Sequence, residues 1–408
     1  MRKIIKYLDH IIYYSIVIIP FSISIAPALA NTFIGFLIAS FVFKKIIKRE
    51  KLFISTSINL PVAFLFIITL VSFKNSINYA DSFRGIFRLV QNAFIFLICA
   101  EEIKEEKHMH KIFLSVVLGA TLASFDSLWQ VFTGKDFIRG YPPVINLGMV
   151  RATASFKDSN VLGIYLSAIA PLIFGVSLYF FKNKKRLFVL FISLICLVGI
   201  LLTYSRPTLL AVYLALFFLS IVKRDKKIIV LLVIGTLISP FIVPKAVKEW
   251  ARQVEYNPFR FMCNDDRIAV YRNSLHMIEA HPVIGLGVNT YMKNYKNYRE
   301  AAEYRNVVTK DYMYAHNNFI HMAAEIGILG LGIFLWLLYR LFADIASMYE
   351  KLKSHYFKIV LLSLSACLLA FLINGLTESS LYYPRVMSIF WYIVGFSLAL
   401  KKFTYADK

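Results

Sequence analysis

The chain alternates between long apolar runs and short polar connections. Each run holds between 16 and 24 residues, and about 20 apolar residues are enough for a helix to cross a bilayer. The pattern therefore predicts about twelve transmembrane helices. The predicted helices cover approximately residues 10–29, 31–46, 57–73, 85–100, 111–131, 161–181, 187–204, 207–222, 227–246, 317–340, 357–376 and 384–400.

The first run follows a basic start, MRKIIKY, as a secretory signal peptide would. It is longer than the apolar segment of a signal peptide, and further apolar runs follow it. We therefore expect it to be retained as the first membrane helix.

Composition agrees with a membrane protein. Apolar residues make up 58% of the 408 residues and charged residues 17%, whereas soluble domains have about 45 to 50% and about 25%. A water-soluble enzyme is excluded, and the predicted fold class is an all-α polytopic membrane protein. The net charge of +22 would suggest nucleic acid in a soluble protein. Here membrane topology accounts for it, so no nucleic-acid partner is predicted.

The basic residues gather in short loops that all fall on one side of the predicted topology. Such loops face the cytoplasm, and they lie at 44–51, 182–186, 223–227 and 401–403. The basic loops fall on one side only if the fourth run, 85–100, spans the membrane, although Arg84 and Arg88 lie at its start. Both termini are then cytoplasmic.

Two long connections, 132–160 and 247–316, are predicted to face outward. No internal repeat divides the chain, so we expect one integral membrane domain over 1–408 with an outer loop at 132–160 and a loop subdomain at 247–316. The second loop is rich in Lys and Arg despite its outward position. A site for an anionic ligand on the outer face would explain this excess.

The cysteines do not indicate a metal site or a disulfide framework. No CxxC or Cys/His spacing surrounds any of them. We therefore predict no metal and no cofactor. The four are Cys99, Cys196, Cys263 and Cys367.

Arg206 stands in LLTYSRPTLLA, a very short turn between two apolar runs. A guanidinium at the membrane surface marks a functional site by default, although an interface arginine can also simply snorkel. Pro207 suits the first turn of the next helix. Arg206 would then lie at a helix entrance, where backbone donors attract anions.

The second outward loop contains CNDDRIAVYRNSLHMIEAHPVIGLGVNTY, residues 263–291. Asn264, Asp265 or Asp266 can cap a helix that Pro282 would end. Arg267 falls in its first turn and Arg272 further along, so an anion is favoured near its start. The aspartates could bind a metal, but pairing with the arginines and capping the helix is the preferred interpretation.

The loop re-enters the membrane at YAHNNFIHMAAEIGILGLGIF, residues 314–334. His321 and Glu325 are four residues apart and share a helix face, which permits a hydrogen bond. His316 and Asn317 precede or open this helix. A neutral imidazole can accept a proton from a hydroxyl, so His316 is a candidate general base, although an interfacial histidine is often only a polar cap.

Smaller signals also fall on the outward side of the predicted topology. Arg151 lies in VRATASFKDSN, and Asn160 opens the following helix. Glu378 and Arg385 lie in NGLTESSLYYPR near the C-terminus.

These segments together resemble the O-antigen ligase and O-antigen polymerase superfamily, including the lipid A core:surface polymer ligases. The resembling pieces are RATASFKDSNVLG at 151–163, SRPTLLA at 205–211, DDRIAVY and HPVIGLGVNTY between 265 and 291, HNNFIHMAAEIGILG at 316–330, and GLTESSLYYPR. The resemblance covers about 151–390, and its order and spacing make it fairly specific. Pro207 and Tyr271 depart from many members, where Trp is common at the latter position.

The resemblance implies a GT-C-type glycosyltransferase with a periplasmic active site in the bacterial inner membrane, acting in lipopolysaccharide biosynthesis. The ligase branch transfers a glycan from undecaprenyl diphosphate to the lipid A core, with inversion and without metal. By position, Arg206, Arg267 and His316 match the family's essential residues. Glu378 and Arg385 match a less consistent pair. Two arginines also suit a diphosphate physically, by bidentate contact.

Three alternatives remain open. An O-antigen polymerase would use the same donor with a lipid-linked repeat as acceptor, and a protein O-glycan transferase would use it with a protein. A transporter of an anion or a lipid-linked sugar would place charges near mid-membrane in repeated halves. The sequence has Asp126 as its main deep ionisable residue and no clear repeat, which favours chemistry at one surface.

Overall fold

The computed structural model describes residues 1–146, 148–263, 265–299 and 313–404. In these ranges the chain is almost entirely helical, and the only strands are β1 (Val144–Asn146) and β2 (Met149–Arg151), which pair antiparallel. Nine of the described helices are long and apolar enough to cross a membrane. The predicted class, an all-α polytopic membrane protein, is confirmed.

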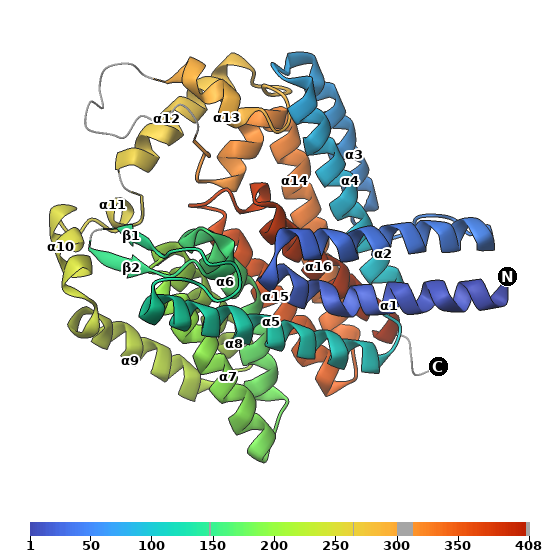
Figure 1. Ribbon diagram of the computed structural model, residues 1–408, viewed down its shortest axis with the longest axis horizontal. Coiled ribbons are helices and arrows are strands. Elements are labelled where there is room, and N and C mark those ends of the chain that lie inside the picture. The colour runs from blue at the N-terminus through green and yellow to red at the C-terminus, as the bar shows by residue number, and fades with distance from the viewer. Residues whose placement is uncertain (147, 264, 300–312, 405–408) are drawn as a thin grey trace.

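Most helices follow one another through short connections, and a longer one between α5 and α6 holds the β1–β2 hairpin (Figure 1). They are α1 (Arg2–Ile25), α2 (Pro27–Lys48), α3 (Asn59–Val71), α4 (Tyr79–Glu102), α5 (Glu106–Thr133), α6 (Ser159–Tyr179), α7 (Asn183–Leu202), α8 (Arg206–Val222), α9 (Lys226–Ile242), α10 (Lys245–Gln253), α11 (Pro258–Met262), α12 (Asp265–Ala280), α13 (Tyr291–Asn294), α14 (Asn318–Lys351), α15 (His355–Asn374) and α16 (Pro384–Ala399). Five 3-10 turns join them: η1 (Ser72–Asn75), η2 (Ala154–Phe156), η3 (Tyr295–Tyr298), η4 (Ser380–Tyr382) and η5 (Leu400–Thr404).

Every predicted apolar run coincides with a helix. The runs at 57–73 and 207–222 form the shorter apolar helices α3 and α8, and the run at 227–246 forms α9, which meets α10 at a 90° bend. The fourth run forms α4, which begins at Tyr79, earlier than predicted. Asn78 caps it by accepting from the Asp81 amide, as short polar side chains do at helix starts.

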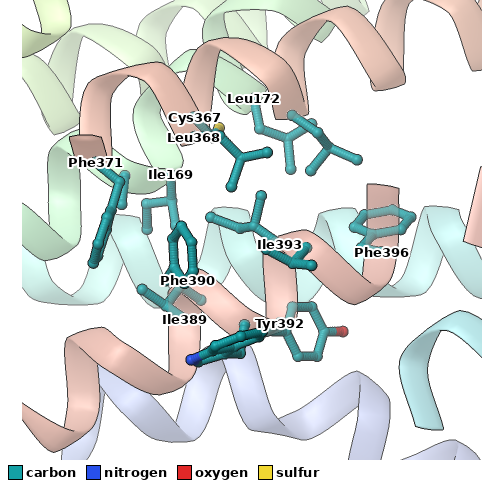
Figure 2. Close-up of a cluster of buried hydrophobic side chains, with 14 of the residues drawn as sticks. Ile169, Leu172, Cys367, Leu368, Phe371, Ile389, Phe390, Tyr392, Ile393 and Phe396 are labelled. Atoms are coloured by element: carbon teal, nitrogen blue, oxygen red, sulfur yellow. The ribbon is translucent and has the colours of Figure 1, made fainter. Parts of the chain in front are cut away.

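The centre of the bundle is α6, whose residues are nearly all buried. It packs against α15, α7 and α8. Figure 2 shows part of this core, where Ile169 and Leu172 of α6 lie near Leu368 of α15 and Ile393 of α16. Small residues allow the close approach: a methyl group on Gly163 would lie 2.5 Å from Thr208 Oγ1 of α8, as is usual for helices packed in a membrane.

The β1–β2 hairpin lies on the side of the molecule opposite the N-terminus. In Figure 1 the hairpin, α10 and α11 lie on the left, whereas the N-terminus lies on the right. Of the predicted outer loop at 247–316, the structure describes α10 to α13 and η3, while residues 300–312 fall outside the described residues.

The loop subdomain is locked to the bundle by a break in α14 at Gly327. This residue has φ 74° and ψ 176°, far from helical values. The segment after Pro282 takes over the freed backbone groups, since Leu286 N donates to Ala324 O (2.9 Å) and Ile328 N donates to Pro282 O (2.8 Å). Only glycine fits there, because a Cβ on Gly327 would lie 2.0 Å from Val283 O.

Candidate functional site

Glu378 is the residue on which the site converges. It lies in the connection between α15 and α16, and none of its surface is exposed. Its Oε1 pairs with the Arg267 guanidinium and accepts from Asn160 Nδ2 at 3.0 Å, and its Oε2 lies 3.1 Å from His316 Nδ1. One carboxylate therefore joins four segments that are distant in the sequence.

The surroundings of Glu378 keep it charged. Burial raises the pKa of this carboxyl, but the nearby Arg267 and His316 favour the ionised form more strongly, so the pKa lies below its ordinary value. A buried carboxylate is tolerated only when it is paired and hydrogen-bonded, and the three partners of Glu378 meet that condition.

His316 presents one ring nitrogen to this carboxylate. A carboxylate only accepts hydrogen bonds, so Nδ1 must carry the proton that it donates to Glu378, and a neutral ring then has its lone pair on Nε2. The side chain is 22% exposed, so a substrate can reach it. The arrangement makes Nε2 a proton acceptor with a fixed orientation.

The backbone around His316 is held in an unusual conformation. His316 has φ 49°, a left-handed value that costs free energy in a non-glycine residue. Tyr271 of α12 donates to the His316 carbonyl at 3.1 Å, and Asn317 caps α14 while its Nδ2 donates to Leu376 O at 2.9 Å. Burial raises the pKa of Tyr271, so its phenol stays protonated and can donate.

Arg206 lies at the start of α8, as predicted, with Pro207 in the first turn. Its guanidinium donates to the Phe261 carbonyl and lies over the rings of Trp250 (5.3 Å) and Phe261 (5.1 Å). Both aromatic residues come from the loop subdomain. Their contacts fix a cation that would otherwise be mobile.

Arg151 completes a group of three arginines. From the end of β2 its Nε donates to Thr203 O at 2.8 Å and its Nη2 to Asn160 Oδ1 at 2.7 Å. Burial, together with the charge of Arg267, lowers its pKa. Arg206 also lies close enough to Arg151 and Arg267 for their charges to repel. The three arginines carry more positive charge than Glu378, the buried carboxylate among them, can balance. The remaining positive charge suits a polyanion.

Four further predicted site residues lie outside the group of three arginines: His321, Glu325, Arg385 and Arg272. His321 Nε2 and Glu325 Oε1 of α14 lie 3.4 Å apart, on the one helix face that their spacing predicts. However, His321 stacks on Tyr382 with ring centroids 3.4 Å apart and contacts Ser379 Oγ at 3.0 Å. Glu325 accepts from the amides of Asn289 (2.8 Å) and Tyr291 (3.0 Å). The pair therefore positions the loop and the segment after Glu378.

Arg385 and Arg272 are also separate from the cluster around Glu378. Arg385 is buried, binds the carbonyls of Ile23 and Ser155, and lies 3.6 Å from the Phe156 ring centroid. It does not pair with Glu378, because α16 directs it toward the end of α1. Arg272 is exposed on α12, about 140° around the helix from Arg267.

Sequence reasoning missed the residues that hold the arginines. Trp250 and Phe261 support Arg206, and Thr203 O accepts from Arg151. The only available signal was the aromatic content of a basic outward loop, which does not indicate a partner. In the part of the chain that the structure describes, no group of three or more His, Cys, Asp or Glu side chains could hold a metal ion.

Comparison with known proteins agrees with the family resemblance. Residues 191–335 match the model of a family described as O-antigen ligase. The matched stretch includes Arg206, Arg267 and His316 and ends before Glu378. No curated protein matches the chain. The predicted resemblance to the O-antigen ligase and polymerase superfamily is thereby confirmed, and it supports a multi-pass bacterial membrane enzyme acting on a lipid-linked glycan.

Proposed function

We propose that the protein is an O-antigen ligase. It transfers a glycan from undecaprenyl diphosphate to a hydroxyl of the lipid A core, without metal or cofactor. The single observation that carries this proposal is the contact of Glu378 with both His316 and Arg267, which places a proton acceptor beside a group of cations. The family match supports the class of substrate.

The arginines hold the leaving group. Bond cleavage at the anomeric carbon leaves negative charge on the diphosphate, and guanidinium groups bind phosphate oxygens in pairs. Arg206 and Arg267 contact the diphosphate in this proposal, and Arg151 supports them from β2. Stabilisation of charge that develops in a partly dry site is often the largest catalytic contribution.

His316 activates the acceptor. Its Nε2 takes the proton of the sugar hydroxyl as that oxygen attacks the anomeric carbon, while the bond from that carbon to the diphosphate oxygen breaks. Attack from the side opposite the leaving group inverts the configuration. Glu378 stabilises the imidazolium that forms and keeps the ring oriented, as the carboxylate of a catalytic triad does.

The proposed orientation places this site on the periplasmic face of the inner membrane, in a GT-C-type architecture, with both termini in the cytoplasm. The bias of short basic loops supports it, and so does the position of the β1–β2 hairpin, which ends at Arg151, opposite the N-terminus in Figure 1. The outer loops 132–160 and 247–316 then supply Arg151 and Arg267 from the same side.

The experiment that tests the proposal is a deletion strain complemented with the wild type or with His316→Ala. Lipopolysaccharide gels and extracts of lipid-linked glycan are compared. Ligation predicts a core without glycan and polymer accumulating on undecaprenyl diphosphate. A core with a single repeat would instead identify a polymerase, and an unchanged ladder would favour transport or protein glycosylation. Glu279→Ala, an exposed position on α12, is the matched control.

A further inference from the structure

A pocket bordered by Tyr382 lies between α3, α4, α14 and α16. Its cavity volume is about 90 Å³, and it is partly open to the surroundings. Its walls are mainly apolar, and they include Leu65, Leu89, Met322, Phe334, Met387 and Trp391. A narrow cavity with apolar walls that is partly open suits one end of a hydrocarbon chain.

One cation, Arg88 of α4, lines the pocket. Its Nη1 donates to the neutral amide oxygen of Asn289 at 3.3 Å, and no described carboxylate forms an ion pair with it. The carboxylate of the lining, Glu325, already accepts from two loop amides. A cation at the border of a membrane helix calls for an anionic partner.

A second polar group in the lining also lacks a partner. Trp391 is 2% exposed, and its Nε1 has no hydrogen-bond partner among the described residues. A buried indole N–H normally finds an acceptor. The pocket therefore offers apolar walls and one cation without an ion-pair partner among the described residues, which together fit a lipid with a phosphate.

The surroundings of the pocket are also apolar. Phe83 and Phe87 of α4 and Ile67 and Leu70 of α3 are large and exposed, as expected for helices in contact with lipid. Arg88 lies about one turn inside the apolar run that begins near residue 85, a depth from which an arginine reaches the head groups. A lipid can thus place its chain in the pocket and its phosphate at Arg88.

We propose that this pocket binds an acyl chain of the acceptor lipid, with the head-group phosphate at Arg88. The inference rests on the proposed function, in which two lipid-anchored substrates meet at His316. Three arginines on the α6, α8 and α12 side take the donor diphosphate. The pocket is lined by residues of α3 and α4 and shares Tyr382 with the His321 stack, so each lipid has its own flank.

Steady-state transfer by the purified full-length protein tests this assignment. Arg88→Gln should raise the acceptor KM about tenfold, the effect of losing one charged hydrogen bond, while kcat and the donor KM stay unchanged. Arg84→Gln is the control, because Arg84 is 69% exposed, pairs with Asp81 and is outside the lining. A change in the donor KM instead, or equal acceptor KM values in both variants, would refute the assignment.

Filling the pocket is an independent test. Met387→Trp should raise the acceptor KM in the same way, whereas Leu118→Trp adds the same ring to an exposed position on α5, away from the pocket, and should not. If both tryptophan variants behave like the wild type, with normal thermal stability, an acyl chain does not occupy the pocket.

Native mass spectrometry tests lipid binding in the pocket independently of the proposed transfer activity. The protein is incubated with diphosphoryl lipid A or, separately, with phosphatidylglycerol. The wild type and Arg84→Gln should retain lipid A about tenfold better than Arg88→Gln. Lipid A binding that depends on Arg88 in a protein without transfer activity would keep the pocket and refute the function. Retention of phosphatidylglycerol alone would identify a bulk-lipid site and refute the acceptor assignment.

Discussion

Glu378 Oε2 lies 3.1 Å from His316 Nδ1, although 62 residues separate them. The same carboxyl group pairs through Oε1 with Arg267. The proposed proton acceptor and one of the proposed phosphate-binding cations therefore share one buried anchor. A change at Glu378 alters both functions together, whereas a change at either partner alters only one.

Neutralising Glu378 should affect catalysis more than folding. In Glu378→Gln, the side chain keeps its size but no longer stabilises a protonated His316 or balances Arg267. We expect kcat for glycan transfer to fall by about 10² to 10⁴. The measurement is transfer by purified protein, with size-exclusion chromatography to verify folding. Glu279→Gln serves as control, and near-normal kcat in Glu378→Gln would contradict the orienting role.

The arginines should be sensitive to shape as well as charge. Lys in place of Arg206 or Arg267 keeps one positive charge but loses the planar fork that binds two phosphate oxygens. Arg206→Lys and Arg267→Lys should each lower kcat by about 10² to 10³, and the alanine variants should abolish transfer while the protein still inserts. Arg260→Lys, at an exposed position of α11, should retain activity. Wild-type rates in either lysine variant would exclude bidentate binding.

The pH dependence of stability follows from the lowered pKa of Glu378. A carboxyl group whose folded pKa is below its unfolded value, about 4.3, stabilises the fold fully above that unfolded value. This contribution disappears as the pH falls through the folded pKa. The difference in melting temperature between the wild type and Glu378→Gln should thus be constant from pH 6 to 8 and shrink below about pH 4. Thermal unfolding in detergent measures it, and a difference that grows on acidification would contradict the sign.

The sequence was sufficient for the helices but not for their breaks. Apolar runs identify membrane helices because each must satisfy its backbone internally in lipid. The break at Gly327 was not predictable, since a partner 40 residues earlier in the chain, near Leu286, satisfies the freed groups. Similarly, α4 starts before its apolar run because Asp81 binds Lys293 of the loop at 2.5 Å.

Residue types at the site were predictable, but their pairings were not. Arg206, Arg267 and His316 stand out because charged groups near membrane helices are costly. The family resemblance matches Glu378 and Arg385 to an acidic and basic pair, yet Glu378 contacts Arg267 and Arg385 donates to Ile23 O. Such partners depend on how the helices pack, which local patterns do not specify.

The last prediction concerns the junction at Gly327. Gly327→Ala would put a Cβ 2.0 Å from Val283 O in a residue with φ 74°, which combines a left-handed penalty with overpacking. We expect a loss of about 2 kcal/mol or more in unfolding free energy and weaker activity, because the loop that carries Arg267 would shift. Gly332→Ala in the same helix meets open space and should be neutral or slightly stabilising. Equal melting temperatures for the two variants would show that the broken helix does not anchor the loop.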